Sequence, residues 1–259
     1  MKLNVVPARV GVQWVKLGIK TFFRQPLALS GLFLMFLAVM SVLSIVPLVG
    51  NALALVLLPG ATLGLMVATA EAAKGNFPMP VLLLTGFKNG RQEMRSMLIL
   101  GGVYAVCFLL VLAITALADG GQFAKLYLMG GAINEEMLQD DRFELAALLA
   151  AGLYLPLSML FWHAPALVHW HGVTPAKSLF FSMVACLRNF WAFNLFGVVW
   201  MLTFVIIGML VAAVVALLGN PQWVGATLFP TAIWMASMFF TSIFFTFQDS
   251  FEKPNGATE

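Results

Sequence analysis

Three histidines that lie close together are the chain's clearest candidates for chemistry. His163, His169 and His171 stand in the sequence His-Ala-Pro-Ala-Leu-Val-His-Trp-His. A zinc site on one helix places two histidines four residues apart beside a carboxylate. Spacings of six and two put these side chains on different faces of a helix, unless Pro165 breaks it. We therefore expect no metal ion here, and we interpret His169 and His171, beside Trp170, as residues of the membrane interface.

His163 differs from the other two because it lies within an apolar run. Ionisable groups at membrane depth usually face the interior of a helix bundle or a water-filled cavity. Glu71 and Asp249, near the ends of other apolar runs, are possible partners. We prefer a structural hydrogen bond at His163 over proton or ion transfer.

Motifs for catalysis are missing from the sequence. It contains no nucleophile elbow, phosphate-binding loop, metalloprotease motif or dinucleotide fingerprint. Cys107 and Cys186 form no C-x-x-C motif and are expected to be small apolar residues. We expect a protein that is not an enzyme and binds no cofactor. A transporter remains open, because Pro59, Pro156 and Pro165 could interrupt helices as in discontinuous-helix sites.

The composition shows which elements must position these residues. Of 259 residues, 61% are hydrophobic and 10% are charged, whereas soluble domains have about 45–50% and 25%. Four runs lack Asp, Glu, Lys and Arg: residues 25–70, 96–118, 145–176 and 189–248. At about 20 residues per spanning helix, they hold two, one, one and two spans. The expected fold is an all-α polytopic membrane bundle of six transmembrane helices, a single integral membrane domain over residues 1–259.

Turn-forming residues divide the two longest runs, from Pro47 to Asn51 and from Gly219 to Gln222. Ala52-Leu53-Ala54 could pass for a signal-peptidase site. However, the apolar run before it is longer than the roughly 7–15 residues of a signal peptide, and another apolar run follows at once. We therefore expect the first span to remain uncleaved.

Positive charge is distributed unevenly between the span ends. If six spans alternate, twelve of the fourteen Lys and Arg residues lie on one side, and only Lys125 and Arg142 lie on the other. The positive-inside rule then places both termini in the cytoplasm. Residues 119–144 become an acidic extracytoplasmic loop, expected to be solvated without a partner, and residues 250–259 a cytoplasmic tail. Because the basic residues form collars at span ends, nucleic acid is not an expected partner.

Three segments before spans are predicted to be amphipathic helices in the cytoplasmic interface, with ordinary loops as the alternative. They lie within residues 1–24, 80–95 and 174–189, the last with Thr174 as N-cap. The polar stripe of the first consists of Arg9, Gln13, Lys16, Lys20 and Arg24, and that of the third of Ser178, Ser182 and Asn189. The candidate contacts for lipid headgroups are Lys20, Arg24, Arg91, Arg95 and Arg188.

An internal repeat is indicated by a shift of 97 residues. The shift aligns Leu58-Pro59 with Leu155-Pro156, Gly75 with Gly172, Pro78 with Pro175, and Arg91 with Arg188. Spans two and three would then correspond to spans four and five as a parallel repeat, with coincidence as the alternative.

Small residues recur every four positions in span two. They are Gly60, Gly64, Ala68 and Ala72. Such a stripe lets two helix backbones approach closely. We expect it to pack within the chain, and the alternative is a homo-oligomer.

Motifs at the span ends carry a family resemblance over the whole chain. They are Arg24-Gln25-Pro26, Ala164 to Val168, Lys177 to Ser182, Leu187-Arg188-Asn189 and Phe245 to Phe251. They resemble a family of six-span inner-membrane proteins of proteobacteria without an established function, which implies a location in the bacterial inner membrane more than a mechanism. The alternation of amphipathic segment and span is more distantly similar to the membrane domain of some bacterial glycerophosphodiester phosphodiesterases, without their catalytic domain.

These observations favour a non-enzymatic inner-membrane protein that acts at the lipid interface or with a partner protein in envelope maintenance. The expected partners are the lipid bilayer and either a second copy or another membrane protein. The alternative is a small permease or lipid-handling transporter with a cavity near His163.

Overall fold

The computed structural model describes residues 2–46, 49–131, 133–217 and 223–251. These residues include six helices long and apolar enough to cross a membrane, which confirms the expected all-α polytopic fold. The spans are Pro26–Ser44, Val49–Lys74, Arg91–Asp119, Asp141–His171, Phe190–Leu217 and Gly225–Ser250. The turn expected at 219–222, part of the turn at 47–51 and most of the tail at 250–259 lie outside the described residues.

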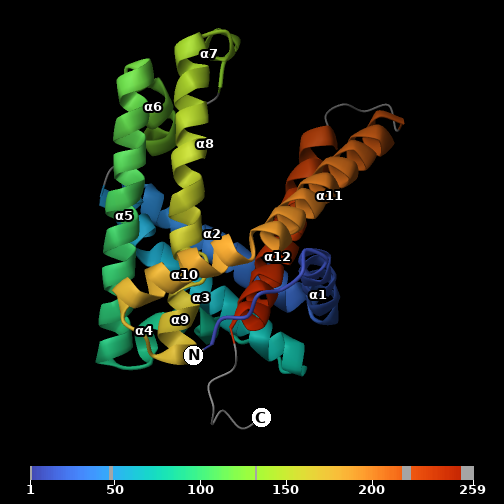
Figure 1. The fold of residues 1–259 in the computed structure, drawn as a ribbon. Helices are drawn as coiled ribbons and strands as arrows, with labels where there is room; N and C mark the ends of the chain where they lie inside the picture. The colour runs from blue at the N-terminus through green and yellow to red at the C-terminus, as the bar shows by residue number, and fades with distance from the viewer. Residues whose placement is uncertain (1, 47–48, 132, 218–222, 252–259) are drawn as a thin grey trace. The chain divides into compact units, whose positions relative to one another are not determined.

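Twelve α-helices and one 3₁₀ helix make up the described fold (Figure 1). They are α1 (Val10–Arg24), α2 (Pro26–Ser44), α3 (Val49–Lys74), η1 (Pro80–Leu84), α4 (Thr85–Lys88), α5 (Arg91–Asp119), α6 (Gln122–Met129), α7 (Glu135–Leu138), α8 (Asp141–Phe161), α9 (Ala164–His171), α10 (Pro175–Arg188), α11 (Phe190–Leu217) and α12 (Trp223–Ser250). They form two compact units. The first contains residues 1–36, 63–85 and 184–259, and the second contains residues 37–62 and 86–183.

In the first unit, α1 packs against α11 and α12. Two glycines make this close approach possible, because a Cβ at Gly11 would collide with the Ala192 carbonyl and one at Gly18 with Ser242. Trp14 lies fully buried on the same face of α1. The expected polar stripe from Gln13 to Arg24 is exposed on the other side. The helix predicted from the stripe therefore exists, and its apolar face packs on the spans.

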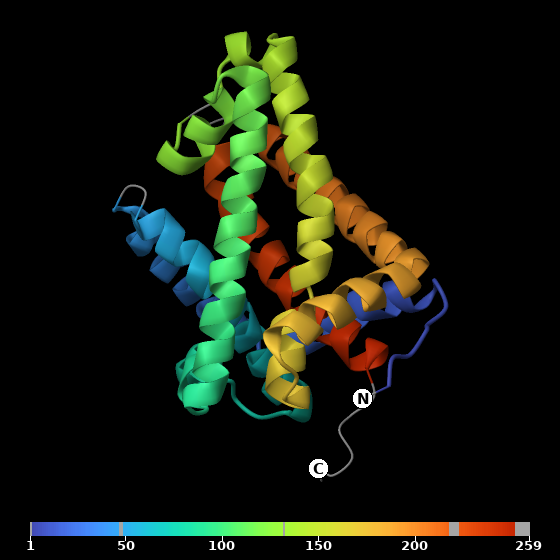
Figure 2. The ribbon, with the colours of Figure 1, turned by 60° about the vertical axis from the view of Figure 1, so that its left-hand side comes forward.

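The helices α11 and α12 pack against each other through aromatic side chains and a hydrogen bond. Trp200 Nε1 donates a hydrogen bond to Ser242 Oγ at 3.1 Å. Its ring also meets that of Phe239, with the centroids 5.8 Å apart. Both views show the two helices side by side (Figure 2).

The third polar stripe is buried, which corrects the expectation that it faces outward. Ser178 and Ser182 have no exposed surface, and Asn189 is 1% exposed. Asn189 Oδ1 accepts the Val6 N–H at 2.8 Å, and its Nδ2 donates to the Asn4 carbonyl at 3.0 Å. Small polar side chains can be buried when their hydrogen bonds are made, so polarity alone did not show which face of α10 packs.

In the second unit, α5 and α8 lie side by side, with α6 packed against both (Figures 1 and 2). The stretch at 119–144, expected to be a solvated loop, contains α6 and α7. Two of its acids bind backbone. Asp119 accepts the N–H groups of Gly121 at 2.8 Å and Phe123 at 2.6 Å, and Asp140 accepts that of Arg142 at 2.9 Å. These acidic side chains stabilise helix starts.

The segment at 80–95 is not one amphipathic helix, contrary to the expectation. It consists of η1, α4 and the first turn of α5. Gly90 lies between α4 and α5. Its φ of +108° is a conformation that L side chains rarely adopt. Arg91 and Arg95 therefore belong to the start of a span.

The 97-residue shift aligns two helix ends. α3 ends at Lys74 before Gly75, and α9 ends at His171 before Gly172; both glycines have positive φ. The correspondence then fails, because Arg91 begins α5 whereas Arg188 ends α10. The local geometry thus supports the repeat around the glycines only.

The prolines act differently from one another. Pro59 and Pro156 lie inside continuous helices. Only Pro165, in the first turn of α9, follows a break in the fourth span. The idea that all three interrupt helices was therefore wrong for the first two.

Candidate functional site

The break in the fourth span is bridged by a serine of α10. Ser182 Oγ accepts the backbone N–H of His163 at 2.9 Å and donates to the Met159 carbonyl at 2.7 Å. In a continuous α-helix the His163 N–H would bind the Met159 carbonyl, so the break leaves these two groups in need of other partners. Ser182 supplies both a donor and an acceptor at this break.

The side chain of His163 is fully buried, with no surface accessible to water. A residue that lines a solvent-accessible cavity would expose some of its surface, even inside the protein. This burial agrees with a packed, structural histidine.

The two carboxylates considered as partners of His163 bind other groups. Glu71 accepts Lys74 Nζ and Asn76 Nδ2, each at 2.8 Å. Asp249 accepts Trp14 Nε1 at 2.8 Å. Glu71 therefore stabilises the end of its own helix, whereas Asp249 connects α12 to α1.

The candidate lipid contacts fall into two groups. Arg24 is exposed, but its Nη1 donates to the Ala73 carbonyl at 2.8 Å and so caps the last turn of α3. In the described part of the chain, the exposed side chains of the others form no ion pair or hydrogen bond. These are Lys20, Arg91, Arg95 and Arg188.

The small-residue stripe of α3 packs within the chain. A Cβ at Gly64 would lie 2.5 Å from Leu83 Cα, and one at Gly60 would collide with the Phe87 ring. Ala68 and Ala72 are fully buried. The stripe therefore accommodates the segment that follows α3.

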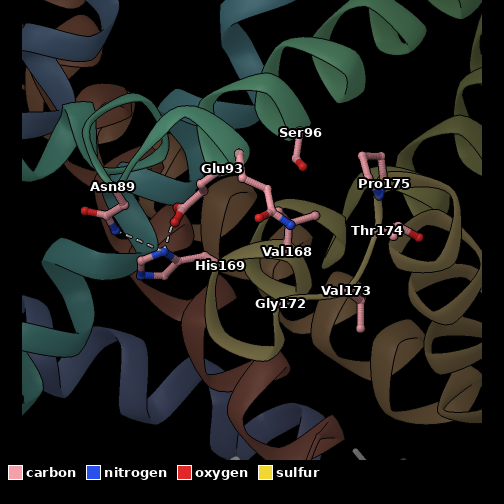
Figure 3. Close-up of a pocket in the computed structure, with 10 residues that line it drawn as sticks. Asn89, Glu93, Ser96, Val168, His169, Gly172, Val173, Thr174 and Pro175 are labelled. Atoms are coloured by element: carbon pink, nitrogen blue, oxygen red, sulfur yellow. Dashed lines mark hydrogen bonds and ion pairs between the residues drawn. The ribbon is translucent and has the colours of Figure 1, made fainter.

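A pocket of about 320 Å³ lies between the start of α5 and the end of α9 (Figure 3). We call it the α5–α9 pocket. Its lining residues are Asn89, Gln92, Glu93, Ser96, Val168, His169, Gly172, Val173, Thr174 and Pro175. Small-molecule sites occupy roughly 300–1,000 Å³, so the pocket is large enough for a compact ligand.

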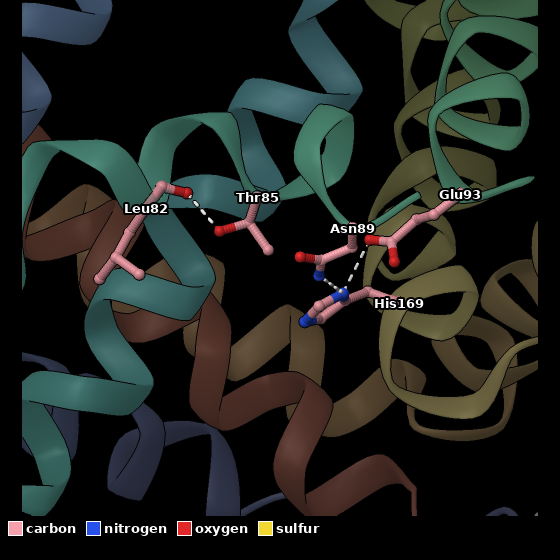
Figure 4. Close-up of polar contacts among 5 residues, drawn as sticks. All are labelled: Leu82, Thr85, Asn89, Glu93 and His169. Atoms are coloured by element: carbon pink, nitrogen blue, oxygen red, sulfur yellow. Dashed lines mark hydrogen bonds and ion pairs between the residues drawn. The ribbon is translucent and has the colours of Figure 1, made fainter. Parts of the chain in front are cut away.

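A hydrogen bond between a histidine and a carboxylate lies at one end of this pocket. His169 Nδ1 is 2.8 Å from Glu93 Oε1, and both side chains are 16% exposed. Asn89 Nδ2 also approaches Nδ1, at 3.5 Å (Figure 4). A carboxylate only accepts hydrogen bonds, so Nδ1 must carry a proton and donate to Glu93. The Asn89 amide therefore cannot donate to that nitrogen.

Within the described residues, no three His, Cys, Asp or Glu side chains come close enough to hold a metal ion. Of these residue types, only Glu93 and His169 are among the described residues that line the α5–α9 pocket.

Sequence reasoning did not find this pocket. It placed His169 at the membrane interface and did not single out Glu93. One signal was available, because Glu93 is the only acid between Lys74 and Asp119 and stands between Arg91 and Arg95. A lone carboxylate at a span end indicates a specific partner, but a partner 76 residues away cannot be read from spacing.

Comparison with known proteins shows a relative that matches nearly the whole chain. The chain is 38% identical to a probable inner membrane protein of Burkholderia thailandensis over 254 residues, which cover 97% of this chain and 94% of the relative. The chain belongs to the family of that inner-membrane protein. The family resemblance noted at the span ends is thereby confirmed at the level of an inner-membrane protein.

The other comparisons assign no activity to the chain. No family model matches the chain, and no solved structure matches it. The distant similarity to the membrane domain of glycerophosphodiester phosphodiesterases receives no support. Together, the relative's name and the six apolar helices make this family member a multi-pass inner-membrane protein.

Proposed function

We propose that the protein is a non-catalytic component of the inner membrane that binds anionic lipid headgroups at the cytoplasmic face and helps to maintain the envelope. The observation that carries the proposal is the set of exposed cations at helix ends: Lys20, Arg91, Arg95 and Arg188. Their charges are not neutralised by carboxylates in the described part of the chain. They are therefore available to phosphate groups.

The helices hold these cations in fixed places. α1 packs on α11 and α12 through Gly11 and Gly18, so Lys20 projects from a docked helix. Arg91 and Arg95 lie four residues apart and therefore on one face of α5. Each Lys or Arg near an anionic leaflet contributes about 1 kcal/mol, so four of them produce a clear preference without a closed pocket.

Orientation is part of the proposal. Alternation of six spans places these four residues on one side, and the excess of Lys and Arg there supports a cytoplasmic location for this side and for both termini. The cytoplasmic leaflet is where anionic lipid gives the stronger attraction.

Quenching of tryptophan fluorescence by brominated lipid tests the proposal. The protein is reconstituted with brominated phosphatidylglycerol, which is anionic, or brominated phosphatidylcholine, which is zwitterionic. The affinity for the first lipid relative to the second is then compared between two double variants. Arg91→Gln with Arg188→Gln should reduce the preference for the anionic lipid about 30-fold, because each cation contributes about 1 kcal/mol. The matched control, Lys125→Gln with Arg142→Gln, removes the same charge from the other side of the chain.

The wild-type preference should also weaken in 0.5 M salt, because exposed charges are screened over only a few ångströms there. An unchanged preference in the first double variant, or an equal loss in the control, would show that the cytoplasmic cations do not select the lipid. Arg24 is left intact, since its loss would also remove a cap from α3.

A further inference from the structure

The α5–α9 pocket has opposite electrical character at its two ends. Glu93 and His169 lie on one side of it, whereas Thr174 and Pro175 lie on the other (Figure 3). The Glu93 carboxylate is the only acidic group in the lining, and no lysine or arginine lines the pocket. One end therefore offers a negative group and hydrogen-bond acceptors.

The end of the pocket at Thr174 and Pro175 is the start of α10, a helix of 14 residues. Backbone N–H groups in the first turn of a helix have no partner within the helix and favour negative charge. The Ser178 N–H already binds the Thr174 carbonyl, which leaves the first-turn N–H groups of Ala176 and Lys177 without a carbonyl partner in α10. The hydroxyl groups of Ser96 and Thr174 add donors in the lining.

At the acidic end, one carboxylate oxygen remains for a ligand. Glu93 Oε1 accepts from His169, and Oε2 makes no hydrogen bond within the described part of the chain. Asn89 and Gln92, whose side-chain amides can accept hydrogen bonds, also line the pocket. Together with Glu93 Oε2, they offer acceptors for the three N–H donors of a primary ammonium group.

We propose that the α5–α9 pocket binds a zwitterionic ligand in which a primary ammonium group lies next to a phosphate, as in a phosphoethanolamine group. The ammonium group binds Glu93, and the phosphate lies at the start of α10. The ligand comes either from a phosphatidylethanolamine headgroup or from a soluble phosphoethanolamine compound. None of the four exposed cations of the proposed function lines this pocket.

The lining argues against other headgroups. A quaternary ammonium group has no N–H to donate and is usually held by aromatic faces, but no Phe, Tyr or Trp lines the pocket. A purely anionic headgroup would meet the Glu93 carboxylate without a lysine or arginine to offset it. A simple amine would leave the positive end at α10 unmatched.

Native mass spectrometry of the full chain released from nanodiscs tests the proposal. The nanodiscs contain equal amounts of phosphatidylethanolamine and phosphatidylcholine with distinguishable acyl chains, and the retained lipids are counted. The wild-type protein should retain the ethanolamine lipid at least about tenfold more often, as expected for one hydrogen bond to a charged group. Equal retention of the two lipids, with no binding of soluble phosphoethanolamine, would overturn the proposal.

Two variants separate the two ends of the pocket. Glu93→Gln should remove the preference for ethanolamine over choline, and Thr174→Val should weaken retention of both lipids alike, because both carry the phosphate. The matched control is Glu144→Gln, which removes an exposed carboxylate from the first turn of α8. Circular dichroism and thermal melting of each variant identify any that fails to fold.

Calorimetry with soluble phosphoethanolamine distinguishes the two sources. Saturable binding that Glu93→Gln abolishes identifies a soluble compound as a ligand, whereas selective retention of the lipid alone identifies the headgroup. Retention of the ethanolamine preference in folded Glu93→Gln would contradict the site. The cation variants of the proposed function should leave this preference unchanged, so each proposal can fail without the other.

Discussion

The indole Nε1 of Trp14 donates a hydrogen bond to Asp249 Oδ2 at 2.8 Å, and this contact joins α1 to the last turn of α12. Trp14 is fully buried, and its ring centroid lies 5.1 Å from that of Phe193 in α11. A helix that was expected to lie in the interface is therefore an integral part of the packing in the first unit.

Replacement of Trp14 by phenylalanine should destabilise the protein measurably. The substitution keeps an aromatic ring but leaves the Asp249 carboxylate without its donor, which costs about 1.5–3 kcal/mol for a charged acceptor. The thermal midpoint of the detergent-purified protein should fall. Trp191→Phe is the matched control, because Trp191 is 73% exposed and should change the midpoint little.

A double-mutant cycle with Asp249→Asn tests whether the effect comes from this hydrogen bond. The two substitutions should be non-additive, because each removes the same contact. Additive losses would mean that Trp14 stabilises the fold through packing alone.

The transmembrane architecture could be predicted from the sequence because charge is excluded from spans. Residues 25–70 lack charge, and α2 and α3 occupy nearly this range. The helix at 10–24 followed equally well from its polar stripe. These features depend on local periodicity and on the solvent around the chain. Both can be recognised directly in the amino-acid sequence.

Packing partners could not be predicted in the same way. Ser182 and Asn189 have the polarity of a solvated face, but their hydrogen bonds to distant backbone bury them. His169 and Glu93 meet across 76 positions. Contacts of this kind depend on tertiary geometry, for which a single sequence offers no periodic signal.

Replacement of Ser182 by alanine should destabilise the protein more than replacement of Ser178. Both serines are fully buried in α10. Ser182 bridges the His163 N–H and the Met159 carbonyl across the break, whereas Ser178 binds only the Pro175 carbonyl of its own helix. The loss for Ser182→Ala should be about 1–3 kcal/mol, measured as a fall in the thermal midpoint. Equal effects of the two variants would show that the bridge adds no stability.

Replacement of Gly64 by alanine should also destabilise the protein. The new Cβ would lie 2.5 Å from the backbone of Leu83, so η1 would have to move away from α3. Overpacking of this kind costs about 1–3 kcal/mol. Gly102→Ala in α5 is the control, because its Cβ would meet no atom within 4 Å. If both variants melt at the wild-type temperature, the stripe does not need its small residues for packing within the chain.

Labelling of single cysteines tests the orientation of the chain. In a cysteine-free background, Lys125→Cys and Lys177→Cys place one thiol on each side expected from alternating spans. Both native lysines are exposed. A membrane-impermeant maleimide should label the first in intact spheroplasts and the second only after lysis. The reverse pattern would place both termini outside the cytoplasm.

The thiol of Cys186 should react very slowly in the folded protein. Burial raises the pKa of Cys186 to about 12, and the thiolate is the reactive form. With Cys107→Ser, Cys186 is the only cysteine, and its alkylation by N-ethylmaleimide should be negligible at pH 7.5 but complete in denaturant. Because the raised pKa lies above the tested range, the thiolate fraction and the rate should still rise about tenfold per pH unit up to pH 9.5.

Ala176→Cys, in a background without native cysteines, is the matched control on the same helix, since Ala176 is exposed. Its rate should level off above about pH 8.5, the ordinary pKa of a thiol, and a similar plateau for Cys186 would contradict its burial in α10.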